Sequence, residues 1–182
     1  MTPAGGRTPR PPGLVVRRET PADVAAIRAV LEAAFPTTGE ADLVEAVRAS
    51  AGYVPAYALV AELRGTIVGH LMLSFVTLAT GSGPVAVPEL APMAVAPEHQ
   101  RTGIGSALVV AALDAAEARD EPLVLVLGHP WFYPRFGFRL ASRFGIRPPR
   151  PVPDAAFMVK PLTTYRRELS GQVLLPPAFD GV

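Results

Sequence analysis

The segment from Leu90 to Ala116, LAPMAVAPEHQRTGIGSALVVAALDAA, constrains the fold of this chain more than any other. An apolar run ends at a proline, a short polar segment follows, and two glycines separated by one residue precede an alanine-rich run. The apolar run is typical of a β-strand and the alanine-rich run of an α-helix. The segment therefore predicts a strand, a tight turn at Gly103 and Gly105, and a helix that begins at that turn.

Known phosphate-binding motifs place glycines at the start of a helix. A nucleotide P-loop needs G-x-x-x-x-G-K-[ST], and the sequence contains no such run. A dinucleotide fingerprint needs G-x-G-x-x-G/A, but Leu108 stands three residues after Gly105 and no ribose-binding acid follows on a later strand. A lone G-x-G also forms ligand-free tight turns, so this alternative stays open from the glycines alone.

A third motif begins at Gln100, where QRTGIG has the form Q-x-x-G-x-G. Gly103 and Gly105 lack a Cβ, so successive main-chain N–H groups can come close to a bound oxyanion. These donors belong to the unpaired first turn of a helix, where the helix dipole adds a partial positive charge. The motif therefore favours a site for a pyrophosphate group.

The other periodic segments predict a mixed sheet with helices. Thr20-Pro21-Ala22-Asp23 is typical of a helix start, with a hydroxyl at the cap and proline at the first helical position. A second helix is predicted over residues 40–49, and Leu63-Arg64-Gly65 predicts a hairpin turn. Strands are predicted at Leu14–Arg18, within AYALVAE and TIVGHLMLSFVTL, and at Val85–Val95, Pro122–His129 and AFMVKPL. The order of elements predicts an α+β fold, with an α/β mixed sheet.

Composition limits the classes of function. The chain has 182 residues, of which 49% are apolar and 18% charged, so it is predicted to be globular. A net charge of +1 gives no reason to expect a nucleic acid partner. Apolar runs are too short to span a membrane, and with no signal peptide in MTPAGGRTPRPPG a cytoplasmic location is expected. Residues 1–13 are predicted to be a disordered tail and residues 14–182 a single domain.

Two motifs together resemble the GNAT superfamily of acyl-CoA-dependent N-acyltransferases. MAVAPEHQRTGIGSAL resembles motif A of that superfamily, and VLGHPWFYPRFGF resembles its motif B. The element order also agrees with the superfamily from Leu14 to about Leu162, which is most of the chain. The LGHP…YPRFGF form is most similar to a bacterial branch of predicted N-acetyltransferases. The resemblance implies a mostly antiparallel central sheet, splayed between its fourth and fifth strands and flanked by helices.

The resemblance also implies acetyl-CoA as the cosubstrate and places its binding residues. The main chain of residues 100–106 would surround the pyrophosphate, and the end of the fourth strand would pair with the pantetheine arm as an added strand. These positions are Gln100, Arg101, Thr102, Gly103, Ile104, Gly105 and Ser106 for the pyrophosphate, and Met93, Ala94 and Val95 for the arm. The cationic side chain of Arg101 stands one place earlier than in many superfamily members, which leaves its contacts open.

Acetyl transfer needs a neutral amine and a protonated leaving thiolate. The resemblance implies Tyr133, in motif B, as the general acid beside the sulfur of CoA. Glu89 on the fourth strand and His129 at the end of the fifth are the candidate bases, and a relay through water is the alternative. Arg135 is expected to pair with an acid or, failing that, to reach a phosphate. The spacing of histidine and acidic residues suggests no metal site, and the chain has no cysteine.

The function expected from these features is an N-acetyltransferase that moves an acetyl group from acetyl-CoA to a primary amine. No covalent enzyme intermediate is implied, because the chain has neither a cysteine nor a G-x-S-x-G serine. The acceptor is expected on a small molecule or a peptide. A catalytically silent CoA-binding sensor or partner module and a structural or interaction protein are the alternatives. A homodimer stays open, because symmetric dimers are common among soluble oligomers.

Overall fold

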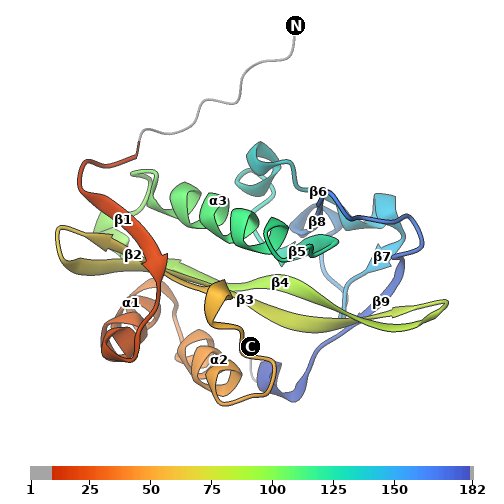
Figure 1. The fold of residues 1–182 in the computed structure, drawn as a ribbon, viewed down its shortest axis with the longest axis horizontal. Helices are drawn as coiled ribbons and strands as arrows, with labels where there is room; N and C mark the ends of the chain where they lie inside the picture. Colours follow the sequence, from red (N-terminus) through yellow and green to blue (C-terminus); the bar gives the residue numbers. More distant parts are fainter. Residues whose placement is uncertain (1–9, 181–182) are drawn as a thin grey trace, which may run out of the picture.

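The chain forms one nine-stranded mixed sheet with helices on both faces (Figure 1). The computed structural model describes residues 10–180. The helices are α1 (Val24–Ala34), α2 (Gly39–Arg48), α3 (Ile104–Glu117) and the short 3-10 turns η1 (Pro21–Asp23), η2 (Pro55–Tyr57), η3 (Pro97–His99), η4 (Tyr133–Phe136), η5 (Ala141–Phe144), η6 (Asp154–Ala156) and η7 (Pro177–Phe179). The strands are β1 (Leu14–Arg18), β2 (Ala58–Leu63), β3 (Thr66–Thr80), β4 (Gly83–Val95), β5 (Leu123–Leu127), β6 (Arg139–Leu140), β7 (Ile146–Arg147), β8 (Phe157–Pro161) and β9 (Gly171–Leu174).

The sheet has the strand order β1-β2-β3-β4-β5-β8-β6. Its neighbours along this path are antiparallel except β4 and β5, which run parallel. The predicted hairpin joins β2 and β3, where Arg64 and Gly65 take φ angles of 52° and 84°. The antiparallel character and the parallel pair confirm the predicted α+β class with a mixed sheet.

Each face of the sheet packs against its own apolar core. On one face, α1 and α2 cover a core that includes Val87, Leu125 and Val159. On the other face, α3 covers a core that includes Val126 and Tyr133. We call these the α1–α2 face and the α3 face, and Figure 1 shows the helices on opposite sides of the strands. Because side chains alternate along a strand, each strand residue can be assigned to one face.

The structure describes both ends of the chain only in part. Most of the predicted tail, residues 1–9, lies outside the described residues, while Pro12 and Gly13 form a turn that leads into β1. Near the other end, β9 returns to pair with Thr77–Thr80 of β3 and with β7. This strand was not predicted, because its four residues carry no clear strand pattern. It forms by pairing with the free edge at the end of the long β3–β4 hairpin.

Candidate active site

The glycine turn presents a row of main-chain donors at the start of α3. Gly103 has a φ of 93°, in the left-handed region, and Arg101 a φ of 61°. The first intrahelical bond runs from the Ala107 N–H to the Gly103 carbonyl at 3.0 Å. The N–H groups of residues 101–106 donate to no acceptor within the described part of the chain. Six consecutive unpaired donors thus lie at the start of α3, where the helix dipole is positive, and such a site suits an anion.

Side chains in this turn hold its shape and leave the donors free. The Gln100 side-chain amide donates to the Val95 carbonyl at 3.1 Å, which ties the turn to the end of β4. The Thr102 hydroxyl donates to the carbonyl of His99. Ile104 is 1% exposed and points into the core under α3. Thr102 and Ile104 can therefore offer a ligand their main-chain N–H groups, whereas the Gln100 N–H already donates to the Pro97 carbonyl at 3.3 Å.

Neither backbone conformation nor crowding inside the protein requires a glycine at position 105. Its φ is not among the positive values, unlike that of Gly103. A Cβ at Gly105 would lie 3.6 Å from Phe132, 3.7 Å from Val95 and 3.8 Å from Met93, which are ordinary contact distances. The protein could therefore accommodate alanine here, and alanine is the better helix former by about 1 kcal/mol. The absence of a side chain at this position is consistent with close approach by a ligand.

The strands next to the glycine turn are parted. β4 and β5 pair at a single register position, Glu89 opposite Leu125. Beyond it, the other edge of β4 pairs with β3 again after a β-bulge, with Leu73 opposite Leu90, Leu71 opposite Met93 and Gly69 opposite Val95. Residues 90–95 of β4 therefore have no register partner on β5, as the predicted splay requires, although the Val95 carbonyl accepts from the Gln100 side chain and the Ala91 carbonyl from Ser74. The structure places Met93, Ala94 and Val95 along this opening.

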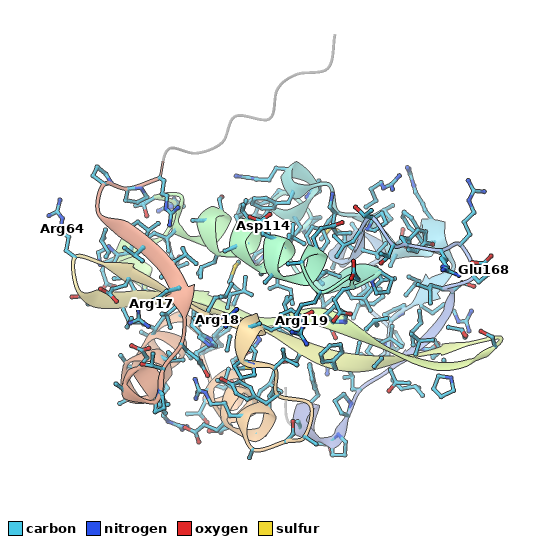
Figure 2. All side chains as sticks on the ribbon, viewed as in Figure 1. Arg17, Arg18, Arg64, Asp114, Arg119 and Glu168 are labelled. Carbon is cyan, nitrogen blue, oxygen red and sulfur yellow. The ribbon has the colours of Figure 1, made fainter. Side chains whose placement is uncertain are left out.

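A groove of about 650 Å³ runs beside α3 from the glycine turn. It is lined by Arg10, Val16, Gly103, Ser106, Ala107, Val110, Ala111, Leu113, Asp114, Glu117, Arg135, Phe136, Lys160 and Leu162. This volume is within the range of sites for small molecules and cofactors. Three of its side chains are cationic, and Figure 2 labels Asp114, one of the acidic ones, on the exposed side of α3. The groove contains neither Tyr133 nor Glu89.

Tyr133 lies against the end of β5, on the α3 face. Its side chain is buried, and its ring meets Phe132 and Phe138 edge to face at 5.0 and 5.5 Å. Gly128 makes room for it, because a Cβ at Gly128 would collide with Cε2 of Tyr133. Burial raises the pKa of the Tyr133 phenol, so the hydroxyl keeps its proton at neutral pH.

Glu89 is buried at the single rung that joins β4 and β5. It is in register with Leu125 and two residues from Val87, and both belong to the core of the α1–α2 face, so Glu89 also points to that face. It is 5% exposed, and its Oε2 has no hydrogen-bond partner among the described residues. Burial raises the pKa of Glu89 to about 7, although the charge of Arg150 acts in the opposite direction. A carboxylate with this pKa can gain and lose a proton near neutral pH.

His129 and Arg135 are placed differently from Glu89. His129 is exposed after β5 and stacks on the exposed Trp131 ring at 5.3 Å. The expectation that Arg135 pairs with an acid is wrong for the described residues. Its guanidinium lies 5.1 Å from the Phe132 ring centroid and lines the groove. Arg135 follows Tyr133 by two residues in η4, and this short turn sets its guanidinium over the Phe132 ring, without an ion pair to the groove acids Asp114 and Glu117.

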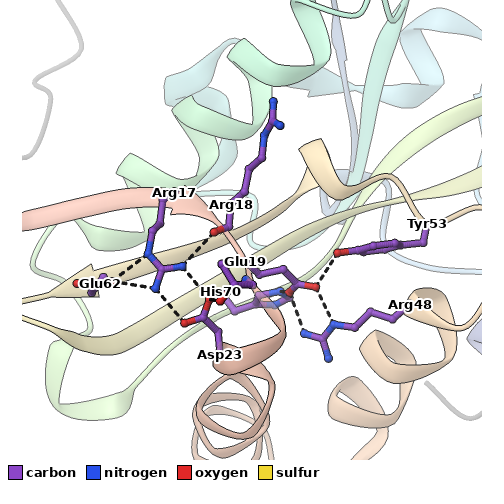
Figure 3. A network of polar contacts seen from close by, with 9 residues as sticks. Arg17, Arg18, Glu19, Asp23, Arg48, Tyr53, Glu62 and His70 are labelled. Atoms are coloured by element: carbon purple, nitrogen blue, oxygen red, sulfur yellow. Dashed lines mark hydrogen bonds and ion pairs between the residues drawn. The ribbon is translucent and has the colours of Figure 1, made fainter.

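A buried polar network on the α1–α2 face was missed by sequence analysis (Figure 3). Glu19, 4% exposed at its side chain, accepts bonds from Arg48 at 2.7 and 2.8 Å and from the Tyr53 hydroxyl at 2.9 Å. Its Oε2 also lies 3.1 Å from Nε2 of the fully buried His70. Arg48 and His70 hold the pKa of Glu19 at about 2, against the effect of burial. No local sequence pattern predicts this network, because its members lie up to 51 residues apart in the chain.

Between residues 10 and 180 there is no helix with the length and apolar character that crossing a membrane requires. The same residues contain no group of three or more histidine and acidic side chains arranged to hold a metal ion.

Comparisons with known proteins agree with this geometry. The family model described as acetyltransferase (GNAT) domain matches residues 15–141, more than half of the chain. The chain is 35% identical over 158 residues to the uncharacterized N-acetyltransferase YjhQ of Escherichia coli, covering 83% of this chain and 86% of that protein. The crystal structure of the E. coli GNAT family N-acetyltransferase YhbS in complex with CoA is similar, with a TM-score of 0.79, 28% identity and 92% of each chain covered.

A second solved structure is a GNAT family acetyltransferase from Brucella melitensis in complex with acetyl-CoA. Its TM-score is 0.74 at 28% identity, and the match covers 92% of this chain and 98% of that one. The match of the family model and the identity to YjhQ, together with the parted strands and the glycine turn, place the chain in a family. The chain belongs to the GNAT family of acetyltransferases.

Proposed function

We propose that this enzyme moves the acetyl group of acetyl-CoA directly to an amine within a ternary complex. The observation that carries the proposal is the row of unpartnered N–H groups over residues 101–106, at the open end of the gap between β4 and β5. Such donors suit a diphosphate, and an unpaired strand edge suits an amide-containing arm that binds as an added strand. CoA has both parts, joined in that order.

The coenzyme would lie on the α3 face. Its diphosphate would accept bonds from the first turn of α3, with Gly105 leaving room for close approach. Arg135 and Lys160 line the groove beside this helix and would offset the remaining negative charge. The pantetheine arm would enter the gap along Met93–Val95. The residue pair at Glu89 and Leu125 closes the gap, so the thioester would come to rest near it.

The acceptor would approach from the α1–α2 face, where Glu89 is the proposed base. In the transfer, the amine nitrogen bonds to the acetyl carbon, the carbon–sulfur bond breaks, and the amine proton passes to Glu89, directly or through water. Tyr133, on the α3 face, would donate a hydrogen bond to the sulfur as negative charge develops there. Because burial raises the pKa of this phenol further above that of a thiol, about 8.5, hydrogen bonding is favoured over complete proton transfer.

A test of the coenzyme site is the melting temperature with and without acetyl-CoA. At a hundredfold excess over Kd, a ligand adds about 2.7 kcal/mol to the stability of the folded state. Gly105→Ala should leave the melting temperature of the free protein unchanged or slightly higher, because its methyl fits and favours the helix. The same methyl should weaken acetyl-CoA binding about 10-fold or more by holding the diphosphate away from the N–H groups.

The matched control is Gly81→Ala, since nothing lies within 4 Å of a Cβ at that turn. It should bind acetyl-CoA as the parent protein does. Full affinity in Gly105→Ala, measured by calorimetry, would place the coenzyme elsewhere. Tight acetyl-CoA binding without transfer to any amine in a broad panel would instead identify a silent CoA-binding module.

Tyr133→Phe should lower kcat at saturating acetyl-CoA by about 10- to 100-fold, the cost of one hydrogen bond to a charged group. Gly128→Ala should produce a similar loss with the hydroxyl still present, because its methyl displaces the Tyr133 ring. Rapid-quench measurement of the first turnover separates the chemical step from product release. Tyr57→Phe is the control, since it removes a phenol bonded to Glu121 beyond the opposite end of α3. An unchanged first-turnover rate in Tyr133→Phe would exclude the proposed contact.

A further inference from the structure

A second cavity, of about 410 Å³, is lined by arginine and aromatic side chains only. This volume is within the range of sites for small molecules. Figure 2 labels Glu168 in the loop after β8 that borders the cavity, at the end of the molecule opposite to Arg64. We call this site the arginine cavity. Its lining residues, from β6, η5 and the loop after β8, are Arg139, Arg143, Phe144, Tyr165 and Arg167.

The arginine cavity is separate from the groove beside α3. The two have no lining residue in common. Arg139 is opposite Val159 on β8, and Val159 belongs to the core of the α1–α2 face, whereas the next residue, Lys160, lines the groove. Because consecutive strand residues point to opposite faces, the cavity and the groove lie on opposite sides of β8. A ligand in the arginine cavity would therefore leave the proposed coenzyme site free.

The polar groups that line the cavity are hydrogen-bond donors without partners. Between residues 10 and 180, no acceptor bonds to the guanidinium of Arg139, Arg143 or Arg167. The ion pairs of these described residues are all made by other cations. Burial raises the pKa of the Tyr165 phenol, so its hydroxyl stays protonated and can donate. The lining thus suits a ligand that is rich in acceptors.

The two aromatic rings give the cavity a fixed floor. Phe144 and Tyr165 both pack against the core of the α1–α2 face, and their rings meet edge to face at 5.6 Å. The Arg139 guanidinium lies 4.9 Å from the Phe144 ring centroid, so one of the three cations is held in place before a ligand binds. Such preorganisation reduces the entropy that is lost on binding.

The charge of the cavity selects the kind of anion. Three arginines line it, and Glu168 acts electrostatically on Tyr165 from outside the lining, which leaves a local formal charge of +2. The wider segment of residues 133–170 contains eight basic and two acidic residues, whereas the complete chain carries only +1. A phosphate monoester has a charge near −2 and three acceptor oxygens, and guanidiniums bind such oxygens in pairs. A carboxylate or a sulfate ester carries one negative charge and would leave part of the positive charge unbalanced.

From these observations we infer that the arginine cavity is a second binding site, which takes a small molecule carrying a phosphate monoester. The phosphate accepts hydrogen bonds from the guanidiniums of Arg139, Arg143 and Arg167. The organic part of the molecule lies against the rings of Phe144 and Tyr165. Because the cavity and the groove are separate, the inference does not depend on the proposed acetyl transfer.

The test is a calorimetric titration with phenyl phosphate at pH 8, with CoA present in excess to occupy the anion site at the glycine turn. Phenyl sulfate has the same shape and a single negative charge, so it is the matched ligand. The parent protein should bind phenyl phosphate with a Kd of about 1 mM or lower, at least about 10-fold more tightly than phenyl sulfate. Arg143→Gln/Arg167→Gln should weaken phenyl phosphate binding at least about 10-fold. Its melting temperature without ligand should not change, because neither guanidinium bonds to another described residue.

The matched control is Arg64→Gln/Arg166→Gln, which removes the same charge from two exposed positions outside the cavity. It should bind phenyl phosphate as the parent protein does. Absence of binding to the parent, equal binding to the two double variants, or equal affinity for phenyl phosphate and phenyl sulfate overturns the inference. Binding that is lost only in Arg143→Gln/Arg167→Gln supports the site even if no amine is acetylated.

Discussion

Glu89→Gln is expected to lower kcat/KM for the amine about 100-fold and to make the protein more stable at pH 8. The first effect follows from removing the proposed base, since a positioned general base contributes at least about that factor. In the parent enzyme, kcat/KM should rise with pH and level off above about 7, where Glu89 is ionised. The variant should lack this inflection.

Glu89→Gln should raise stability although it lowers activity, and both effects come from the loss of the Glu89 carboxyl group. The pKa of Glu89 is about 7 in the folded protein and has an ordinary value of 4.5. Between these values the unfolded chain ionises while the folded protein keeps its proton, so stability falls as pH rises through this window. The loss amounts to about 3 kcal/mol above pH 7. Glutamine cannot ionise and avoids it, so the two proteins should converge in stability near pH 4.

Chemical denaturation at pH 4 and pH 8, with initial rates across the same range, tests both effects. Glu32→Gln, which removes a half-exposed acid on α1, serves as the control and should change neither. If Glu89→Gln retained the parent rate and its pH profile, another group or bulk water would be the base. If its stability matched the parent at pH 8, the carboxylate would not be desolvated as described.

Glu19→Gln should destabilise the protein by about 3 to 5 kcal/mol, because it removes the buried carboxylate that pairs with the partly buried Arg48. For a chain of this size, that corresponds to a melting temperature lower by about 10 °C. The network joins the end of β1, the end of α2 and the middle of β3, so its loss should loosen α2 from the sheet. Thermal unfolding measures the effect. Glu45→Gln breaks an ion pair in which Glu45 is 50% exposed and should cost less than about 1 kcal/mol.

The contribution of Glu19 also depends on pH. Its pKa is about 2 in the folded protein against an ordinary value of 4.5. A lowered folded-state pKa gives stability that is fully present above about pH 4.5 and is lost as pH falls toward 2. The parent protein should therefore lose about 3 kcal/mol over this window that the Gln variant does not lose. A parallel decline in both proteins would contradict the ion pair.

Features set by a few neighbouring residues could be predicted from the sequence. The turn at Arg64 and Gly65, the start of α3 at the glycines, and the uniformly apolar β5 each follow from local rules of conformation and periodicity. The resemblance added the parted strands, which no local rule gives. Glu89 could be singled out because a lone acid stands within an apolar strand, although its burial and its pKa required the packed structure.

Features made by distant segments could not be predicted. Glu19 and Arg48 are 29 residues apart, and no periodicity links a strand end to the last turn of a helix. Charge alone suggested an acidic partner for Arg135, whereas the turn at η4 places its guanidinium over the Phe132 ring.

The single register position between β4 and β5 divides the sheet into two smaller sheets, joined by one pair of residues and by the apolar cores on both faces. A coenzyme arm lying in the gap would supply the missing hydrogen bonds and join the two halves into a continuous ladder. Under the proposed function, acetyl-CoA is thus both the substrate and a bridge between β4 and β5. When free CoA leaves, the hydrogen bonds that bridge the two halves of the sheet would be lost until the next acetyl-CoA binds.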